Sequence, residues 1–194
     1  MASKINDIML VLASASPRRQ ELLRSAGFSF TVQAADIDET PLAEESARDC
    51  AERLAREKAL AVARTRPHDI VLGADTIVVV DGTILGKPVD AADAARMLRR
   101  LSGRVHSVIT GVCVVEGRES QSLRTASETT LVTMSALSDE EIRGYVATGE
   151  PMDKAGAYAI QGMAARWIPR IEGDYTNVVG LPLARVHGML RGLL

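Results

Sequence analysis

The chain has 194 residues and a formal net charge of -2; 46% of its residues are hydrophobic, 25% are charged and 3% are aromatic. This composition is typical of a soluble globular domain, either single or with two lobes around a shared core. The acidic balance and scarce aromatic rings argue against general nucleic-acid binding, which needs many cations for phosphates and rings for stacking bases. No apolar run approaches the roughly 20 residues that cross a bilayer, and we expect a cytoplasmic protein with no membrane partner.

The N-terminal part of the sequence alternates between strand and helix signals. Residues 8–13 form a short apolar run that predicts a buried strand. Ser16-Pro17 then predicts the start of a helix, and Gly27 predicts its end. Alternating apolar residues predict a second strand over residues 28–32, and the longest helical pattern covers about residues 46–65.

The central segment DIVLGADTIVVVDG predicts two apolar strands interrupted by Gly73-Ala74-Asp75-Thr76. Asp81-Gly82 is a strong signal for a hairpin turn. Asp90 predicts the cap of a helix that runs to Leu101. The C-terminal half predicts, in order, strands over residues 105–115 and 123–134 joined across Glu116-Gly117, a capping box at 138–141, a loop with short extended pieces over 149–162, extended structure over 168–179 and a helix from about Pro182. This order of elements indicates an α/β protein with a mixed sheet.

The two cysteines, Cys50 and Cys113, have neither a metal-type nor a redox-type spacing. Cys50 falls in the long helical pattern and Cys113 in a predicted strand. We expect both to pack as small core residues, and the absence of a disulfide framework fits a reducing compartment.

Basic and hydroxyl side chains gather where the first strand meets the first helix, at Ser14, Ser16, Arg18 and Arg19. Free N–H groups and the positive dipole end at a helix N-terminus favour anions, and arginine binds phosphate oxygens two at a time. This arrangement predicts a phosphate cradle, and the alternative is a capped helix with two solvated arginines.

Asp75-Thr76 places a carboxylate between apolar stretches, where burial is costly unless the group is paired, hydrogen-bonded or bound to metal. Strand ends are also where α/β proteins place reactive groups. Asp75 therefore has a predicted functional role, and the alternative is that it caps a local turn.

Two lysines are further candidates for anion binding. Lys58 falls on the inner stripe of its helix, so its side chain must either extend to solvent or meet an anion. Lys87 lies in a loop bounded by glycine and proline, where it either reaches a phosphate or stays exposed.

Two polar segments remain as candidates. The acidic loop with Asp36, Asp38 and Glu39 either supplies oxygen ligands to a divalent cation or is simply solvated. The segment from Glu150 to Gln161 holds a glutamine that can both donate and accept, as base recognition needs, and the alternative is turn structure with incidental polar groups: Asp153, Lys154, Tyr158, Gln161.

Taken in order, five blocks resemble the signature blocks of the Maf family of nucleotide pyrophosphatases. They are LASASPRRQELL, GADTIVVVDGTILGKP, LSGRVHSVITGV, DKAGAYAIQG and IEGDYTNVVGLPL, and they run from about Leu10 to Leu183. The resemblance implies one domain over residues 1–194, with an elongated mixed α/β sheet, flanking helices and two lobes around a cleft, like inosine triphosphate pyrophosphatases. It implies hydrolysis between the α and β phosphates of a nucleoside triphosphate, with Mg2+ or Mn2+ and as a homodimer.

The same resemblance assigns roles to residues of this sequence. The catalytic carboxylate, thought to act as a general base, falls on Asp75, which is also a candidate metal ligand together with Glu39. The specificity positions fall on Arg18, Thr76 and Gln161. The phosphate-facing serine and cations fall on Ser14, Arg19, Lys58 and Lys87.

The blocks DKAGAYAIQG and DYTNVVGLPL resemble the subgroup that acts on dTTP and UTP. The expected function is therefore a dTTP/UTP pyrophosphatase, with modified pyrimidine nucleotides as further possible substrates. The alternatives are a pyrophosphatase of the 7-methyl-GTP subgroup and a nucleotide-binding regulator of septum formation and cell division.

Overall fold

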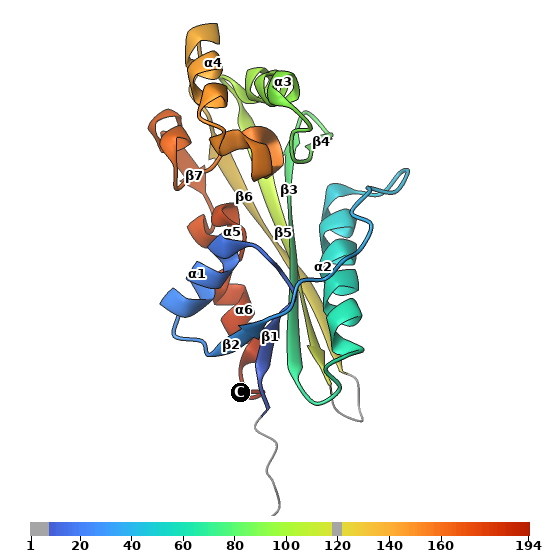
Figure 1. Cartoon of the computed structure of the whole chain (residues 1–194). Helices are drawn as coiled ribbons and strands as arrows, with labels where there is room; N and C mark the ends of the chain where they lie inside the picture. The colour runs from blue at the N-terminus through green and yellow to red at the C-terminus, as the bar shows by residue number, and fades with distance from the viewer. Residues whose placement is uncertain (1–7, 118–121) are drawn as a thin grey trace, which may run out of the picture. The chain divides into compact units, whose positions relative to one another are not determined.

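The structure is a computed structural model that describes residues 8–117 and 122–194 (Figure 1). Its strands form a seven-stranded mixed sheet in the order β2-β1-β3-β5-β6-β7, with β4 paired to β3. β1 runs parallel to β2 and β3, whereas β4 and β7 pair antiparallel with β3 and β6. The strands are β1 (Leu10–Leu12), β2 (Phe30–Val32), β3 (Ile70–Val80), β4 (Thr83–Leu85), β5 (Val105–Glu116), β6 (Leu123–Thr133) and β7 (Arg170–Glu172).

Helices flank this sheet, so the predicted mixed α/β class is confirmed. They are α1 (Pro17–Ser25), α2 (Ala47–Ala63), α3 (Ala91–Leu101), α4 (Asp139–Ala147), α5 (Tyr175–Val179) and α6 (Leu183–Leu190), with 3-10 turns η1 (Glu150–Asp153), η2 (Ala155–Ala157) and η3 (Met163–Trp167). Among the described residues, none of these helices has the length and apolar character to span a membrane.

The chain divides into two compact units. Unit 1 comprises residues 1–75, 111–127 and 183–194, and unit 2 comprises residues 76–110 and 128–182. The prediction of one domain over residues 1–194 stays a prediction.

In unit 1 the helix starts follow the sequence signals. Ser16 caps α1 and Ser46 caps α2, each with its hydroxyl oxygen accepting from a backbone N–H three residues later. Figure 1 shows α2 on one side of the strands and α1 on the other. Both cysteines are buried as predicted, in α2 and β5.

The predicted interruption at residues 73–76 is wrong, because β3 is one continuous strand of 11 residues. Gly73 serves close packing here and makes no turn. A Cβ atom at Gly73 would stand 2.1 Å from the carbonyl oxygen of Ala55 in α2, and one at Gly111 would stand 2.2 Å from that of Ala51. Glycine at these two positions therefore lets the backbone of α2 lie directly against β3 and β5.

Unit 2 begins with the predicted hairpin. Asp81 and Gly82 both have positive φ, at 48° and 71°, as the tight turn between β3 and β4 requires. The Asp90 cap of α3 and the capping box at the start of α4 are also confirmed. These elements enclose an apolar core that includes Leu98, Tyr145 and Trp167.

Two predictions for the C-terminal half are wrong. Instead of extended pieces, the segment after α4 forms the turns η1 and η2. Extended structure over residues 168–179 is limited to β7, because Asp174 accepts from the N–H groups of Thr176 and Asn177 and so starts α5. The last helix, α6, is confirmed.

A histidine lies inside the core of unit 2. His106 is 2% exposed, and its Nε2 lies 2.8 Å from the hydroxyl of Tyr158. The two rings meet edge to face, with centroids 5.3 Å apart. Burial disfavours the imidazolium form and lowers the pKa of His106 to about 4.

We predict that Gly73→Ala lowers the free energy of unfolding by at least about 2 kcal/mol, because the new methyl group meets backbone atoms of α2 that have no room to yield. Urea denaturation measures the change. Gly144→Ala in α4 is the matched control, since a Cβ there meets nothing within 4 Å and alanine favours a helix. Equal stability of the two variants would contradict the packing argument.

The buried imidazole predicts a pH-dependent loss of stability. The unfolded chain takes up a proton at His106 near pH 6.5, the ordinary value, whereas the folded protein does so only near pH 4. Stability contributed by the neutral form is therefore lost as pH falls from about 6.5 to about 4, by up to roughly 3 kcal/mol. We expect the stability advantage of wild type over His106→Gln to shrink across this window in urea titrations. Parallel curves for the two proteins would refute this account.

Candidate functional site

The junction between β1 and α1 holds the first group of site residues, all in unit 1. Ser14 follows β1 and is 7% exposed, and its hydroxyl oxygen accepts from a guanidinium nitrogen of Arg19 at 3.0 Å. The same oxygen accepts from the backbone N–H of Ser16 at 3.3 Å. Because Ser16 caps α1, the first turn of the helix is fixed and Arg19 is held inward instead of being solvated.

The second group joins α2, β3 and the acidic loop. Lys58 is buried on the inner face of α2, and its ammonium donates to Asp75 Oδ1 at 2.6 Å. The same ammonium lies 2.6 Å from Glu39 Oε1, so one lysine bridges two carboxylates. Of the two alternatives for Lys58, meeting an anion is the one that the structure supports.

Asp75 lies in the middle of β3, and neither the predicted strand end nor the alternative turn cap describes it. Side chains alternate along a strand, so residues 73 and 75 share a face. Gly73 faces α2, where its missing Cβ admits the backbone of Ala55, and Asp75 therefore also faces α2. Close helix packing thus brings Lys58 within reach of a carboxylate two residues away from the glycine.

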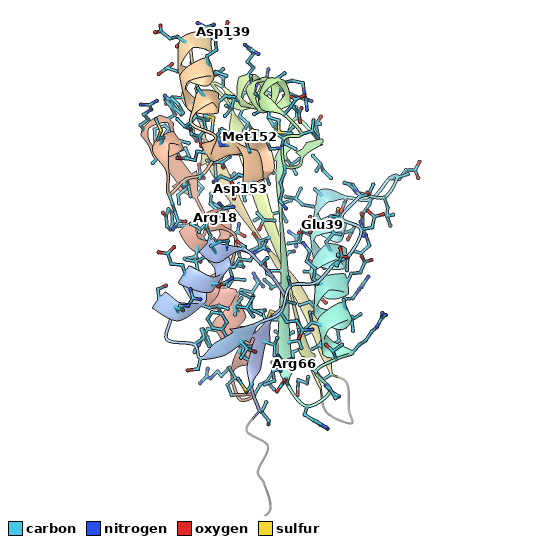
Figure 2. All side chains as sticks on the ribbon, in the orientation of Figure 1. Arg18, Glu39, Arg66, Asp139, Met152 and Asp153 are labelled. Carbon is cyan, nitrogen blue, oxygen red and sulfur yellow. The ribbon has the colours of Figure 1, made fainter. Side chains whose placement is uncertain are left out.

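The charged residues of the two groups described above interact electrostatically. Burial lowers the pKa of Arg19, the negative charges of Asp75 and Glu39 raise it, and the positive charge of Arg18 lowers it further. Cations exceed carboxylates by one in this set: Arg18, Arg19 and Lys58 against Glu39 and Asp75. Figure 2 shows Arg18 in α1 and Glu39 in the loop beside α2. A group of this charge is suited to an added anion.

The three acidic residues of the loop, Asp36, Asp38 and Glu39, differ in whether they contact Lys58. Asp38 is exposed and accepts from both the backbone N–H and the hydroxyl of Thr40, at 2.9 and 2.6 Å. These bonds lower the pKa of Asp38 and indicate a local turn. Asp36 is also exposed, so Glu39 is the acidic residue of this loop that joins the Lys58 group.

Thr76 follows Asp75 and points to the opposite face of β3. Its hydroxyl lies 3.0 Å from that of Thr110 in β5 and 3.4 Å from the carbonyl oxygen of Gly180, both within unit 2. Asp75 and Thr76 are adjacent in sequence, but they belong to different sets of contacts.

Gln161 is exposed on a short turn of unit 2 that hydrogen bonds to Glu150 hold in place. The carboxylate of Glu150 accepts from the hydroxyl of Tyr145 at 2.8 Å and from the backbone N–H of Met163 at 3.1 Å. Gly162 N–H donates to Ala159 O and closes the turn around Gln161.

The other candidates of this segment make contacts within unit 2. Tyr158 binds His106, while Lys154 pairs with Asp153 and donates to the carbonyl of Glu150. Figure 2 shows Asp153 beside Met152 in the turn η1.

Lys87 is exposed in the loop after β4, next to Gly86, whose carbonyl accepts from Gly156 N–H.

Sequence reasoning missed the residues that hold these groups in place. Glu150 and Tyr145 hold the turn of Gln161, and Thr110 and Asn177 hold Thr76. A usable signal was present for Thr110, because a threonine stands alone in the apolar stretch of residues 108–115. At Gly73, the preference of glycine for turns predicted an interruption of the strand, and the role of this glycine in close packing was missed.

Comparison with known proteins identifies the family. The sequence model described as "Maf-like protein" matches residues 9–193. A protein of Koribacter versatilis is 59% identical over 182 residues, covering 94% of this chain and 93% of the relative, and is named "dTTP/UTP pyrophosphatase". Proteins of the same name from Symbiobacterium thermophilum and Geobacter sulfurreducens are 58% and 59% identical, covering 93% and 94% of this chain and 92% and 95% of the relatives.

Solved structures also resemble this chain, and two of them are described here. One is a nucleoside-triphosphatase, or dITP/XTP pyrophosphatase, from Mycobacterium abscessus, with a TM-score of 0.42, 16% identity and coverage of 67% of this chain and 76% of that chain. The other is a HAM1 protein from Coxiella burnetii, with a TM-score of 0.43, 19% identity and coverage of 66% and 73%. The sequence matches alone decide the family, and by them this chain belongs to the Maf-like proteins.

Proposed function

We propose that this protein hydrolyses dTTP and UTP with water between the α and β phosphates, releasing the nucleoside monophosphate and pyrophosphate. The observation that carries the proposal is the buried carboxylate of Asp75, held 2.6 Å from the Lys58 ammonium in a unit that also buries Arg19. Relatives named dTTP/UTP pyrophosphatase match 93–94% of this chain, which supports the choice of substrate.

A triphosphate carries nearly four negative charges, so a lone carboxylate base would repel it. Fixed cations lower this cost because they are already in place when charge develops on the phosphates. We assign Arg18, Arg19, Lys58 and Lys87 to the phosphates, with the hydroxyl of Ser14 as a further contact. The bond from Arg19 to Ser14 holds both groups in position before substrate arrives.

Asp75 acts as the general base in this proposal. Its carboxylate accepts the proton of the attacking water while the new oxygen–phosphorus bond forms and the bond to the leaving pyrophosphate breaks. Lys58 holds one carboxylate oxygen at 2.6 Å and so fixes the orientation of the group. Asp75 is part of the hydrogen-bonded strand β3 and not of a loop, and this limits the movement of its backbone.

A divalent metal ion, Mg2+ or Mn2+, fits the residues present. Oxygens of Glu39 and Asp75 both lie 2.6 Å from one cationic centre, the Lys58 ammonium, so they converge as ligands of a hard cation would. Within residues 8–117 and 122–194 no cluster of three His, Cys, Asp or Glu side chains forms, but Mg2+ commonly takes one or two carboxylates plus substrate phosphates. Bound there, the metal would lower the pKa of water and offset phosphate charge.

We assign Thr76 and Gln161 to the base. A site that hydrogen-bonds one base rejects another by leaving polar groups unpaired. Gln161 both donates and accepts, and its turn is held by Glu150. We further propose a homodimer that acts in the cytoplasm and has no nucleic-acid partner.

Replacement of the base tests the catalytic assignment. We expect Asp75→Asn to lower turnover of dTTP about 100-fold or more, the usual scale for loss of a general base. Released pyrophosphate, converted to phosphate by added pyrophosphatase, provides the measurement. The matched control is Asp81→Asn, which changes an exposed carboxylate at the hairpin and should keep nearly full turnover. Near-normal turnover in a folded Asp75→Asn protein would reject the assignment.

A nucleotide panel with and without EDTA tests the substrate and the metal. We expect dTTP and UTP to be cleaved faster than ITP and 7-methyl-GTP, and EDTA to abolish turnover until Mg2+ or Mn2+ is restored. Faster cleavage of 7-methyl-GTP would place the protein in the other subgroup. Binding of dTTP with no pyrophosphate release in the presence of either metal would instead support a nucleotide-binding regulator.

A further inference from the structure

One arginine of α2 connects the acidic loop to the helix that carries Lys58. The guanidinium of Arg53 donates to both carboxylate oxygens of Glu45, at 2.7 Å from Nε and 2.9 Å from Nη2. The same Nη2 donates to the backbone carbonyl of Thr40 at 3.1 Å. Arg53 therefore binds the loop at two places, at residue 40 through the backbone and at residue 45 through a side chain.

The loop and the helix both fix the direction of this guanidinium. On the loop side, the Glu45 oxygen that binds Nη2 also accepts from the backbone N–H of Leu42 at 3.2 Å. On the helix side, Nη1 lies 3.3 Å from Glu57, four residues along α2. Only 13% of the Arg53 side chain and 10% of the Glu45 side chain are exposed. Charged, two-pronged bonds of this kind are among the stronger hydrogen bonds of proteins, and they have a defined geometry.

These bonds lie directly beside Glu39, which precedes Thr40 in the chain. The Glu39 carboxylate lies 2.6 Å from the Lys58 ammonium, but the proposed function gives each of the two a further partner of opposite charge, a metal ion and a phosphate. Those partners would weaken the bond between Glu39 and Lys58. The bonds from Arg53 to Thr40 and Glu45 use groups that have no part in the proposed reaction, so they can hold the loop with and without substrate.

We infer that Arg53 and Glu45 are positioning residues, which hold the loop so that the Glu39 carboxylate stays at the proposed metal site. A ligand on a loop that must first become ordered binds its metal more weakly, because ordering the backbone costs conformational entropy. The inference rests on the proposed function, in which Glu39 is a metal ligand. It adds two residues that act on the metal only through Glu39.

The decisive variant is Arg53→Gln, because positioning and simple charge predict opposite results. Removal of a positive charge near the site would by itself strengthen the binding of a cation. Loss of positioning weakens it, and we expect the Kd for Mn2+ to rise about tenfold, the lower end of the usual range for residues that orient a metal ligand. The electron paramagnetic resonance signal of free Mn2+, titrated with protein in the absence of nucleotide, measures this Kd. Arg56→Gln, which changes an exposed arginine of the same helix, is the matched control and should not raise it.

A second variant keeps the charge constant. Arg53→Lys retains the positive charge but lacks the planar fork that binds both oxygens of Glu45. We expect it to weaken Mn2+ binding as well, whereas a pure effect of charge would leave the Kd unchanged. Hydrogen exchange at the backbone amides of residues 40–45 should be faster in both Arg53 variants than in wild type and in Arg56→Gln. Circular dichroism and urea denaturation check that each variant is folded.

The possible outcomes separate this inference from the proposed function. Unchanged or tighter Mn2+ binding by folded Arg53→Gln would overturn the inference and leave the proposed function intact. Wild-type protein that hydrolyses dTTP but binds no Mn2+ alone would also overturn the inference, because Glu39 would then not form a metal site before substrate arrives. Wild-type protein that releases no pyrophosphate from dTTP or UTP would overturn the proposed function itself.

Discussion

The Lys58 ammonium lies 2.6 Å from a carboxylate oxygen of Asp75, with 8% and 11% of the two side chains exposed. Removing either charge from water alone would be costly. The attraction between the two charges offsets this desolvation cost only while α2 and β3 keep their relative position. Glu39 is half exposed and joins the same ammonium from the acidic loop. The buried charge of Asp75 and the position of Lys58 therefore depend on one three-residue interaction.

Close packing makes this interaction possible. Glycines at 73 and 111 remove the Cβ atoms that would otherwise collide with the carbonyls of Ala55 and Ala51. With α2 seated against β3, Asp75 stands on the same face as Gly73 and meets the lysine of the helix. Arg19 reaches the same electrostatic environment from α1, where its bond to Ser14 holds it, and burial lowers its pKa while Asp75 and Glu39 raise it. The close approach of the α2 backbone to β3 thus makes the Lys58–Asp75 ion pair possible.

The alternation of side chains along β3 separates two tasks. Asp75 on one face belongs to a set of charges, and Thr76 on the other belongs to a set of neutral hydrogen bonds that ends at Thr110 and Asn177. The charged set is suited to an added polyanion, whereas the neutral set ties β3 to β5 and α5 through hydrogen bonds. Consecutive positions of one strand therefore belong to a charged set and to a neutral hydrogen-bonded set, to which the proposed function assigns the phosphates and the base.

The sequence by itself determined the α/β class, most of the helices with their caps, the hairpin at Asp81-Gly82 and the resemblance to the family, because caps, turns and apolar periods are local signals. It also singled out Ser14, Arg19, Lys58 and Asp75, since charged or polar groups in apolar surroundings need partners wherever the chain takes them. Only the tertiary structure decided that β3 runs unbroken through Gly73, that Glu39 and not Asp38 joins Lys58, and that Thr110 and Asn177 hold Thr76. Each of these depends on a partner distant in sequence, and neither the spacing of residues nor their local preferences record which distant groups will meet.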